Sequence, residues 1–227
     1  MLCPPPGVMT SGTCGCRSTS SRQKVSALAT SWASRGKLVI AGHFGFAALV
    51  KSREPTAPLW GLMLATVWLD WIFAPLLALH LEYVEPVHPG YGGLIIHADY
   101  THSILGALLL AAILGLAFLP RWGRRVSTVI ALVVMSHWVL DLIVHRPDMP
   151  VLPGNVGDLP RFGFGLWTQP KVSAVLELLL VAIGSLLYWR AAKQVSVDAG
   201  RSGTWAGVCA GLVAASGILV LYLDYSS

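Results

Sequence analysis

Charged residues are scarce in this chain. Only 12% of its 227 residues are Asp, Glu, Lys or Arg, while 55% are hydrophobic and the mean hydropathy is +0.65. An ordinary soluble domain carries about 25% charged residues, so the composition excludes that class. Because long apolar runs take the place of the missing charge, we expect an all-α, polytopic bundle of transmembrane helices.

Cysteine is also rare, and several familiar motifs are missing. Three of the four cysteines, Cys3, Cys14 and Cys16, precede the apolar segments, and Cys209 lies inside one. Their spacing predicts neither a disulfide framework nor a zinc finger. The chain has no phosphate-binding glycine loop, no serine nucleophile elbow and no nucleic-acid signature. We therefore expect no nucleic-acid partner.

The amino-terminal region lacks acidic residues, since none occurs before Glu54. Residues 1–36 are rich in Ser, Thr, Gly, Pro and Arg, which predicts a disordered basic tail. An organellar transit peptide or a start codon assigned too early are the alternatives. Residues 37–227 are predicted to form the transmembrane domain.

Five apolar segments approach the ~20 residues that cross a bilayer, and the first segment is shorter. The six segments cover residues 38–50, 58–80, 100–119, 126–144, 172–189 and 204–223. The sequence thus predicts five firm spans and one short amino-terminal membrane helix. This first helix either tilts, re-enters or extends backwards.

Lys and Arg occupy alternate connections between these segments. They are Lys51 and Arg53, then Arg121, Arg124 and Arg125, then Arg190, Lys193 and Arg201. Cytoplasmic loops carry the excess of positive charge, so these connections are predicted to face inward. Residues 81–98 and the Pro- and Gly-rich loop 145–171 then face outward, and the second loop is expected to cover a site. We expect an integral membrane protein whose site opens toward the outer face.

The strongest candidate site lies in SHWVLDLIVH, residues 136–145, where His137, Asp141 and His145 follow at steps of four. At ~100° per residue these side chains share one helix face. Ionisable groups are expensive inside a bilayer, and imidazoles with a carboxylate are common metal ligands. This stripe therefore predicts the centre of a metal site.

Other ionisable residues are predicted to lie at a similar depth. From a rise of ~1.5 Å per residue, Asp70 and His137 both fall in the outer half of the bilayer, and His102 and Glu177 lie near the outer surface. A shared cavity explains this agreement better than scattered polar residues do. The candidate metal ligands are His43, Asp70, His97, His102, His137, Asp141 and His145.

Three polar residues in or next to the stretch 97–102, namely Asp99, Thr101 and Ser103, are predicted to support the site. Asp99 is expected to cap the following helix, and Thr101 or Ser103 to orient an imidazole through its second nitrogen. For His43, a hydrogen bond to a backbone carbonyl is the alternative to metal binding.

Asp70 and Glu177 are also candidate catalytic carboxylates. Asp70 has no basic residue in its segment, so it is either protonated or faces a cation. Glu177 is either a ligand or a general acid or base beside the metal. A structural pair with Lys171 or Arg161 is the alternative for Glu177.

Four of these features together resemble the YdjM-type family of membrane-bound, metal-dependent hydrolases. They are His43, Asp70, HADYTHS at 97–103 and SHWVLD at 136–141, and the resemblance covers about residues 38–150. The third family motif reads His-Arg-Gly-aromatic-Thr-His-Ser, so Ala98 and Asp99 depart from it, and Trp68 replaces the first carboxylate of an Asp-x-Asp motif. The resemblance implies a hydrolase of a bacterial inner membrane that is similar to zinc-dependent phospholipases C.

A catalytic site of this kind would activate a water molecule through a divalent metal. Zinc is the first expectation because nitrogen ligands dominate, with manganese or iron if carboxylates do. A site in the outer half of the membrane favours a lipid phosphoester or similar amphiphile as substrate. Arg146 and Arg161 are predicted to hold its phosphate, or alternatively to anchor lipid headgroups.

Two other classes of membrane protein use buried His and carboxylates. A transporter or ion or proton relay is the main alternative, although the sequence shows no internal repeat. A haem protein is the third possibility, and it would absorb in the Soret band. Tightly bound metal after purification separates the hydrolase from the transporter. The sequence does not determine the oligomeric state.

Overall fold

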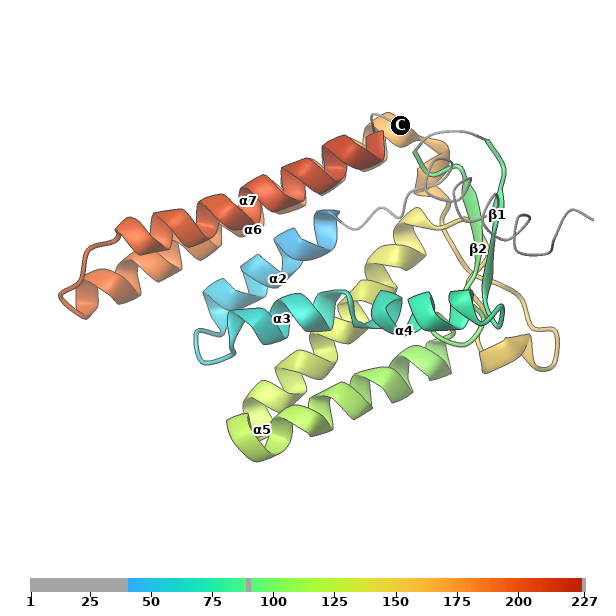
Figure 1. Cartoon of the computed structure of the whole chain (residues 1–227), viewed down its shortest axis with the longest axis horizontal. Coiled ribbons are helices and arrows are strands. Elements are labelled where there is room, and N and C mark those ends of the chain that lie inside the picture. The colour runs from blue at the N-terminus through green and yellow to red at the C-terminus, as the bar shows by residue number, and fades with distance from the viewer. Residues whose placement is uncertain (1–40, 89–90, 226–227) are drawn as a thin grey trace, which may run out of the picture. The chain divides into compact units, whose positions relative to one another are not determined.

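The computed structural model describes residues 41–88 and 91–225. By its contacts the chain divides into residues 1–34 and residues 35–227, and every described residue belongs to the second unit. The predicted tail, residues 1–36, therefore lies outside the described residues. Within the described ranges most residues are helical, as the composition predicts (Figure 1).

Six α-helices and a short β-hairpin make up the described part of the chain. The helices are α2 (Ala41–Arg53), α3 (Leu59–Thr66), α4 (Trp68–Ala78), α5 (Ile104–Val144), α6 (Pro170–Asp198) and α7 (Thr204–Tyr225). The strands are β1 (Tyr83–Pro86) and β2 (Leu94–His97), and short 3-10 helices cover Pro153–Asn155 and Leu166–Thr168.

Three of these helices, α5, α6 and α7, are long and apolar enough to cross a membrane. The pair α3 and α4 forms a fourth candidate if it is one span, bent by 47° at Val67. The prediction of a membrane protein is thus confirmed in part. Five firm spans are not confirmed, because the second predicted span is broken and the third and fourth predicted spans are joined in one helical element.

The long helix α5 consists of two antiparallel arms (Figure 1). Gly123 interrupts it with φ 75° and ψ 176°, a conformation open essentially to glycine alone. Beyond this break the Ser127 hydroxyl donates to the Gly115 carbonyl at 2.7 Å, so the two arms lie side by side. The short basic segment that separates the two apolar runs of the sequence therefore lies at this bend.

Buried apolar side chains join α3 and α4 to both arms of α5. Leu62, Leu69 and Ile130 are fully buried in this core. Burying such side chains contributes about 1.5–3 kcal/mol each in an aqueous reference, and packing takes over that role between helices in lipid. The core fixes the positions of α4 and of the second arm of α5, which carry candidate ligands.

Helix α2 packs closely against α6, and glycines allow the approach. A Cβ atom on Gly45 or Gly184 would collide with the backbone of the opposite helix. Small residues of this kind let helix backbones meet in a membrane. The contact brings the amino-terminal turns of α2, including His43, against the part of α6 that contains Glu177.

The region between α4 and α5 corrects the all-α prediction. Strands β1 and β2 pair antiparallel, with Tyr83 opposite His97 and Val84 opposite Ile96. Tyr, Val and Ile favour strands, and the Gly-rich stretch before Leu94 ends the connection between them. The outward loop predicted over 81–98 is therefore partly a β-hairpin.

Candidate metal centre

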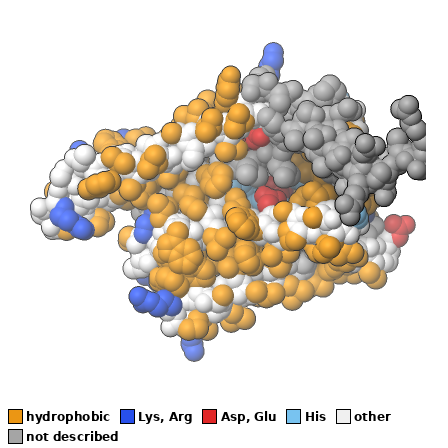
Figure 2. Space-filling view, viewed as in Figure 1, with side chains coloured by type: hydrophobic (Ala, Val, Ile, Leu, Met, Phe, Trp, Pro, Cys, Tyr) orange, Lys and Arg blue, Asp and Glu red, His pale blue; other side chains and the backbone are white. Residues whose placement is uncertain are grey.

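Six side chains from distant parts of the chain meet in one polar cluster. They are His43 of α2, Asp70 of α4, His102 just before α5, His137 and Asp141 in the second arm of α5, and His145 at its end. All are buried except Asp70, which is partly exposed. Figure 2 shows acidic and histidine side chains in the middle of one hydrophobic face.

The centre of the cluster is a triangle of three ligand atoms. His137 Nε2 lies 3.0 Å from Asp141 Oδ2, His102 Nε2 lies 3.3 Å from the same oxygen, and the two nitrogens are 3.4 Å apart. A tetrahedral ion with bonds of 2.0–2.2 Å places neighbouring ligand atoms about 3.3–3.6 Å apart. The triangle therefore has nearly the dimensions of one face of such a site.

Asp70 lies against this triangle from α4. Its Oδ1 is 3.6 Å from His102 Nε2, and its Oδ2 is 3.7 Å from His137 Nε2. Oδ2 is buried and has no hydrogen-bond partner among the described residues. Val67 ends α3 with φ −120° and ψ 11°, and α4 starts in a new direction one residue later. This bend is what carries Asp70 to the ligands of α5.

His43 and His145 complete the cluster at its edge. His43 Nε2 lies 3.3 Å from Asp141 Oδ1 and makes no hydrogen bond within residues 41–88 and 91–225. His145 Nε2 lies 3.9 Å from Asp141 Oδ2. The two oxygens of Asp141 thus face different histidines. Besides the central triangle, two overlapping sets of described residues meet the spacing of metal ligands: His43 with His137 and Asp141, and Asp70 with His102 and His137.

The contact of the other ring nitrogen of His137, Nδ1, shows which nitrogen carries the proton. Nδ1 lies 2.6 Å from the backbone oxygen of Thr66. A carbonyl only accepts hydrogen bonds, so Nδ1 carries the proton. Nε2 of the neutral ring then presents a lone pair to the cluster. The end of α3 therefore orients this imidazole, and this is the arrangement that metal-binding histidines adopt.

His102 is oriented by Glu82, a residue that the sequence analysis missed. Glu82 is fully buried and accepts hydrogen bonds from the amides of Tyr100 and Thr101 and from the Thr101 hydroxyl. Since that hydroxyl donates to Glu82, its oxygen accepts from His102 Nδ1 at 2.9 Å. Nε2 of a neutral His102 is again the lone-pair nitrogen. The only sequence signal was a single acid directly after an apolar run.

His145 has a similar partner in Asp148, which was also missed. His145 Nδ1 lies 3.0 Å from Asp148 Oδ1, and the other oxygen of Asp148 accepts from the Ile96 amide at 3.0 Å. A carboxylate accepts, so Nδ1 again carries the proton. Asp148 is only 3% exposed. Its distance of three residues from His145 was the signal available in the sequence.

These contacts leave the cluster with converging acceptors. With neutral rings, the Nε2 atoms of His102, His137 and His145 present lone pairs, and Asp70 and Asp141 add carboxylate oxygens. Buried acceptors that face one another without a donor are unfavourable unless a cation joins them. The mixture of nitrogen and oxygen ligands in this buried His and Asp group fits a bound metal ion.

The structure does not bring His97 into the cluster. Its ring stacks on Tyr83 at 4.1 Å between centroids, and its Nε2 lies 3.6 Å from Glu85 Oε2. The pairing of β1 and β2 causes this placement, since Tyr83 and His97 are opposite partners in the register. Its predicted role as a ligand has no support in the geometry.

The prediction that Asp99 caps α5 is wrong. The residue before α5 is Ser103, whose hydroxyl oxygen accepts from the Gly106 amide at 3.0 Å. Asp99 instead binds Arg161 through both guanidinium Nη atoms, at 2.5 and 2.9 Å. This pair raises the pKa of Arg161, which also donates to the Asp148 backbone oxygen. Arg161 therefore ties loop 145–171 to HADYTHS and is occupied by protein partners.

The other predicted phosphate ligand, Arg146, lies near the hairpin. Its Nη2 is 3.2 Å from His88 Nε2, and its buried Nε has no hydrogen-bond partner in the part of the chain that the structure describes. The loop that it begins also covers His145, because the buried ring of Trp167 lies 4.3 Å from that imidazole. Loop 145–171 thus packs over one edge of the cluster.

Glu177 lies beside the cluster and belongs to neither ligand set. It accepts from the Gly42 amide at 3.2 Å and from the Tyr91 hydroxyl at 2.5 Å. Burial, together with the Glu177 charge, raises the pKa of Tyr91. These bonds take the place of the predicted pair with Lys171 or Arg161, and they join α2, α6 and the end of the hairpin connection.

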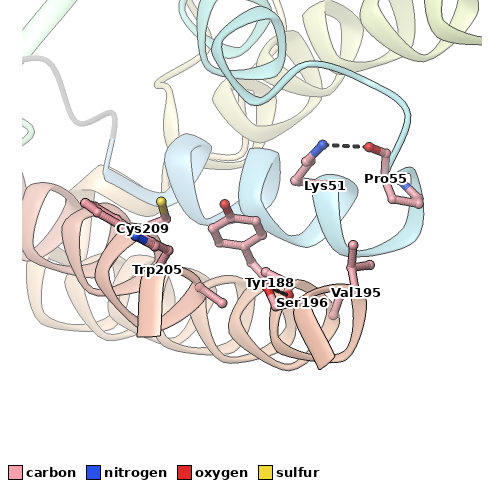
Figure 3. Close-up of a pocket in the computed structure, with 10 residues that line it drawn as sticks. Lys51, Pro55, Tyr188, Val195, Ser196, Trp205 and Cys209 are labelled. Carbon is pink, nitrogen blue, oxygen red and sulfur yellow. Dashed lines mark hydrogen bonds between the residues drawn. The ribbon is translucent and has the colours of Figure 1, made fainter. Parts of the chain in front are cut away.

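A cavity of about 270 Å³, away from the cluster, lies near the carboxyl-terminal ends of α2 and α6 (Figure 3). Lys51, Tyr188, Trp205 and Cys209 are among its lining residues, and no His, Asp or Glu lines it. The Lys51 ammonium donates to the backbone oxygens of Pro55 and Ala57 at 2.8 and 2.7 Å. Among the described residues, the groups that could hold a metal ion lie toward the opposite end of these helices.

A scan against protein-family models and searches of curated proteins and of solved structures found no match for this chain. The candidate metal centre consequently rests on the geometry of its own side chains. The resemblance to membrane-bound hydrolases remains a prediction from the motifs.

Proposed function

We propose that this chain is a membrane-embedded, metal-dependent hydrolase that acts on a lipid phosphoester or a similar amphiphile. The observation that carries the proposal is the convergence of lone pairs and carboxylates from His102, His137, Asp70 and Asp141. The four motifs of the family resemblance contain all four of these residues. His43 and His145 are proposed to complete the ligand set.

The proposed topology has five crossings. The pair α3 and α4 forms the first, the two arms of α5 the second and third, and α6 and α7 the last two. Lys and Arg near the bend of α5 and between α6 and α7 then lie on the cytoplasmic side. The cluster, the hairpin and loop 145–171 lie toward the outer face. We propose a bacterial inner membrane as the location, which the family resemblance implies.

Hydrolysis needs an activated water and a carboxylate that can accept its proton. A divalent ion, zinc by preference, would lower the pKa of a bound water toward ~7. Asp70 is the carboxylate suited to receive the proton, because it is the most exposed member of the cluster and its Oδ2 is unpaired. Arg146 has an unpaired Nε and is the better candidate for a phosphate contact, since Arg161 is bound to Asp99.

The substrate class follows from the surroundings of the cluster. Helices α5 and α6 carry exposed Leu, Ile and Val side chains, as lipid-facing helices do. A water-soluble substrate would have to leave water to reach this depth, whereas a lipid already has its chains in the membrane. An amphiphile with a hydrolysable headgroup therefore suits the site best.

The test combines metal content with turnover in the full-length protein in detergent. We expect the native protein to retain zinc, manganese or iron, and to hydrolyse a phospholipid in mixed micelles until a chelator removes the metal. Asp141→Asn should lose both properties, since it removes the charge at the centre of the cluster. A native protein that is folded and free of metal, or loaded with metal and inactive on phospholipid, would overturn the proposal.

An ion transporter is the second candidate, and the bend at Val67 favours it. Broken helices beside buried charges occur at the ion sites of transporters. The Thr66 carbonyl at the bend contacts His137 directly. Zinc movement into vesicles that contain the protein, together with absence of hydrolysis, would identify the transporter.

A further inference from the structure

An elongated apolar pocket adjoins the metal cluster between α5 and α6. It has a volume of about 430 Å³, within the range of small-molecule sites. Apolar side chains form most of its wall: Leu140, Ile143, Val144, Leu166, Leu176, Leu179, Leu180 and Ile183. Water gains no hydrogen bonds from such a lining, so the pocket favours an apolar occupant.

The shape of the pocket follows the axis of α6. Its lining on this helix runs from Ser173 to Ile183, which corresponds to about 15 Å at the helical rise. Leu176, Leu180 and Ile183 recur at helical spacing and form one continuous stripe. An apolar lining that extends about 15 Å along one helix suits an extended hydrocarbon chain better than a compact ring.

One part of the pocket is polar and leads to the cluster. His43 lines the pocket, and its Nε2 is also 3.3 Å from Asp141 Oδ1. Glu177 and Gly42 line the pocket as well, and the bond from the Gly42 amide to Glu177 holds them together. A molecule that fills the apolar part can therefore place its polar end against a proposed metal ligand.

We propose that this pocket binds one hydrocarbon chain of an amphiphile and directs its polar headgroup to His43 and the metal cluster. This assignment rests on the proposed function for its catalytic meaning, but the binding itself requires no turnover. Glu177, which lines the polar end, is an acid. A zwitterionic headgroup has a positively charged group that suits this acid, so its binding does not require a metal. The pocket thus selects the chain, and the cluster acts on the headgroup.

Two neighbouring leucines on α6 allow a matched test. Leu179 lines the pocket and is 48% exposed, whereas Leu178 is 44% exposed and does not line it. Leu179→Trp fills the pocket, and Leu178→Trp adds the same bulk to a different face. Leu176→Phe is a second filling variant with a milder change, also at an exposed lining position.

The measurement is native mass spectrometry of the full-length, metal-stripped protein with dodecylphosphocholine as the probe. We expect one bound probe molecule in the native protein and in Leu178→Trp, and an affinity at least about tenfold weaker in Leu179→Trp and Leu176→Phe. Butylphosphocholine should not bind, because its chain cannot fill the pocket. Equal binding in all four proteins, or binding of both probes alike, would overturn the proposal.

The same variants separate this inference from the proposed function. With metal restored, phospholipid hydrolysis in mixed micelles should fall in Leu179→Trp while its metal content stays unchanged. Probe binding that depends on Leu179 without any hydrolysis would leave the pocket standing and remove the hydrolase. Hydrolysis at native rates in Leu179→Trp and Leu176→Phe, with no chain-dependent binding, would remove the pocket alone.

Discussion

His97 and His102 belong to the same short motif, HADYTHS, yet they lie in different environments. His97 ends strand β2, is partly exposed and stacks on Tyr83. His102 is 3% exposed and points its Nε2 at His137 and Asp141. The comparison shows that a histidine becomes a candidate ligand here only when buried neighbours orient it toward other acceptors.

The partners of the two rings explain the difference. His102 has a relay through Thr101 to the buried carboxylate of Glu82. His97 has only the exposed carboxylate of Glu85 nearby, at 3.6 Å. A charged group that is open to water is screened and orients a ring weakly. The predictions that follow change one member of this comparison at a time.

The largest effect is expected for His102→Ala. The substitution removes a vertex of the central triangle, and losing a direct ligand should exceed the ~10–100-fold loss in metal affinity that supporting residues cause. Elemental analysis of the purified protein and zinc titration of the stripped protein measure this. Metal content equal to that of the native protein would show that the triangle is not the site.

Glu82→Gln should have the next largest effect. The amide keeps the shape of the side chain, but it lacks the charge that holds the Thr101 hydroxyl and two backbone amides. We expect metal affinity to fall by ~10–100-fold while the protein stays folded. Glu85→Gln is the matched control, since Glu85 is exposed and faces His97 outside the cluster, and this variant should bind metal normally. An identical response of the two variants would refute the relay.

Arg161→Gln is expected to affect stability more than metal binding. It removes the bidentate pair with Asp99 and the bond to the Asp148 backbone oxygen. For a partly exposed pair the cost is about 1 kcal/mol, seen as a lower melting temperature in detergent. Metal content should stay close to the native value. Loss of metal comparable to His102→Ala would give Arg161 a role beyond holding the loop.

The smallest effect is expected for His97→Ala. The ring is partly exposed and contacts only Tyr83 and Glu85 in the described structure. The side chain is 19% exposed and its charged partner Glu85 is open to water, so the substitution should lower the free energy of unfolding by about 0.5 kcal/mol. Zinc titration and thermal unfolding should both match the native protein. Weaker zinc binding here would place His97 in the site after all and end the contrast with His102.

Much of the architecture could be predicted from the sequence because bilayer crossing depends on local composition. The apolar runs anticipated α6 and α7 within a few residues at their starts, although α6 continues to Asp198. The bend at Val67 and the fused arms of α5 could not be predicted, since neither Val67 nor the basic segment around Gly123 has a unique local signal. The β-hairpin was also missed, because strands of four residues each give too short a sequence pattern.

The candidate site likewise contains residues that the sequence predicted and residues that it did not. The stripe of His137, Asp141 and His145 could be read from helical periodicity, because residues four apart share a face. His43, Asp70 and His102 were expected at this site from their rarity in apolar surroundings. Glu82 and Asp148 had no such signal, as they lie in connecting segments where acids are common.

The sequence alone determined that this is a membrane protein with ionisable residues concentrated in a few helices, since composition and period are local properties. Only the tertiary structure decided which of them meet. The register of β1 and β2 directs His97 to Tyr83, the bend at Val67 carries Asp70 to His102, and the fold places Glu82 behind Thr101. Each of these contacts joins segments distant in sequence, and their positions depend on packing across the whole bundle.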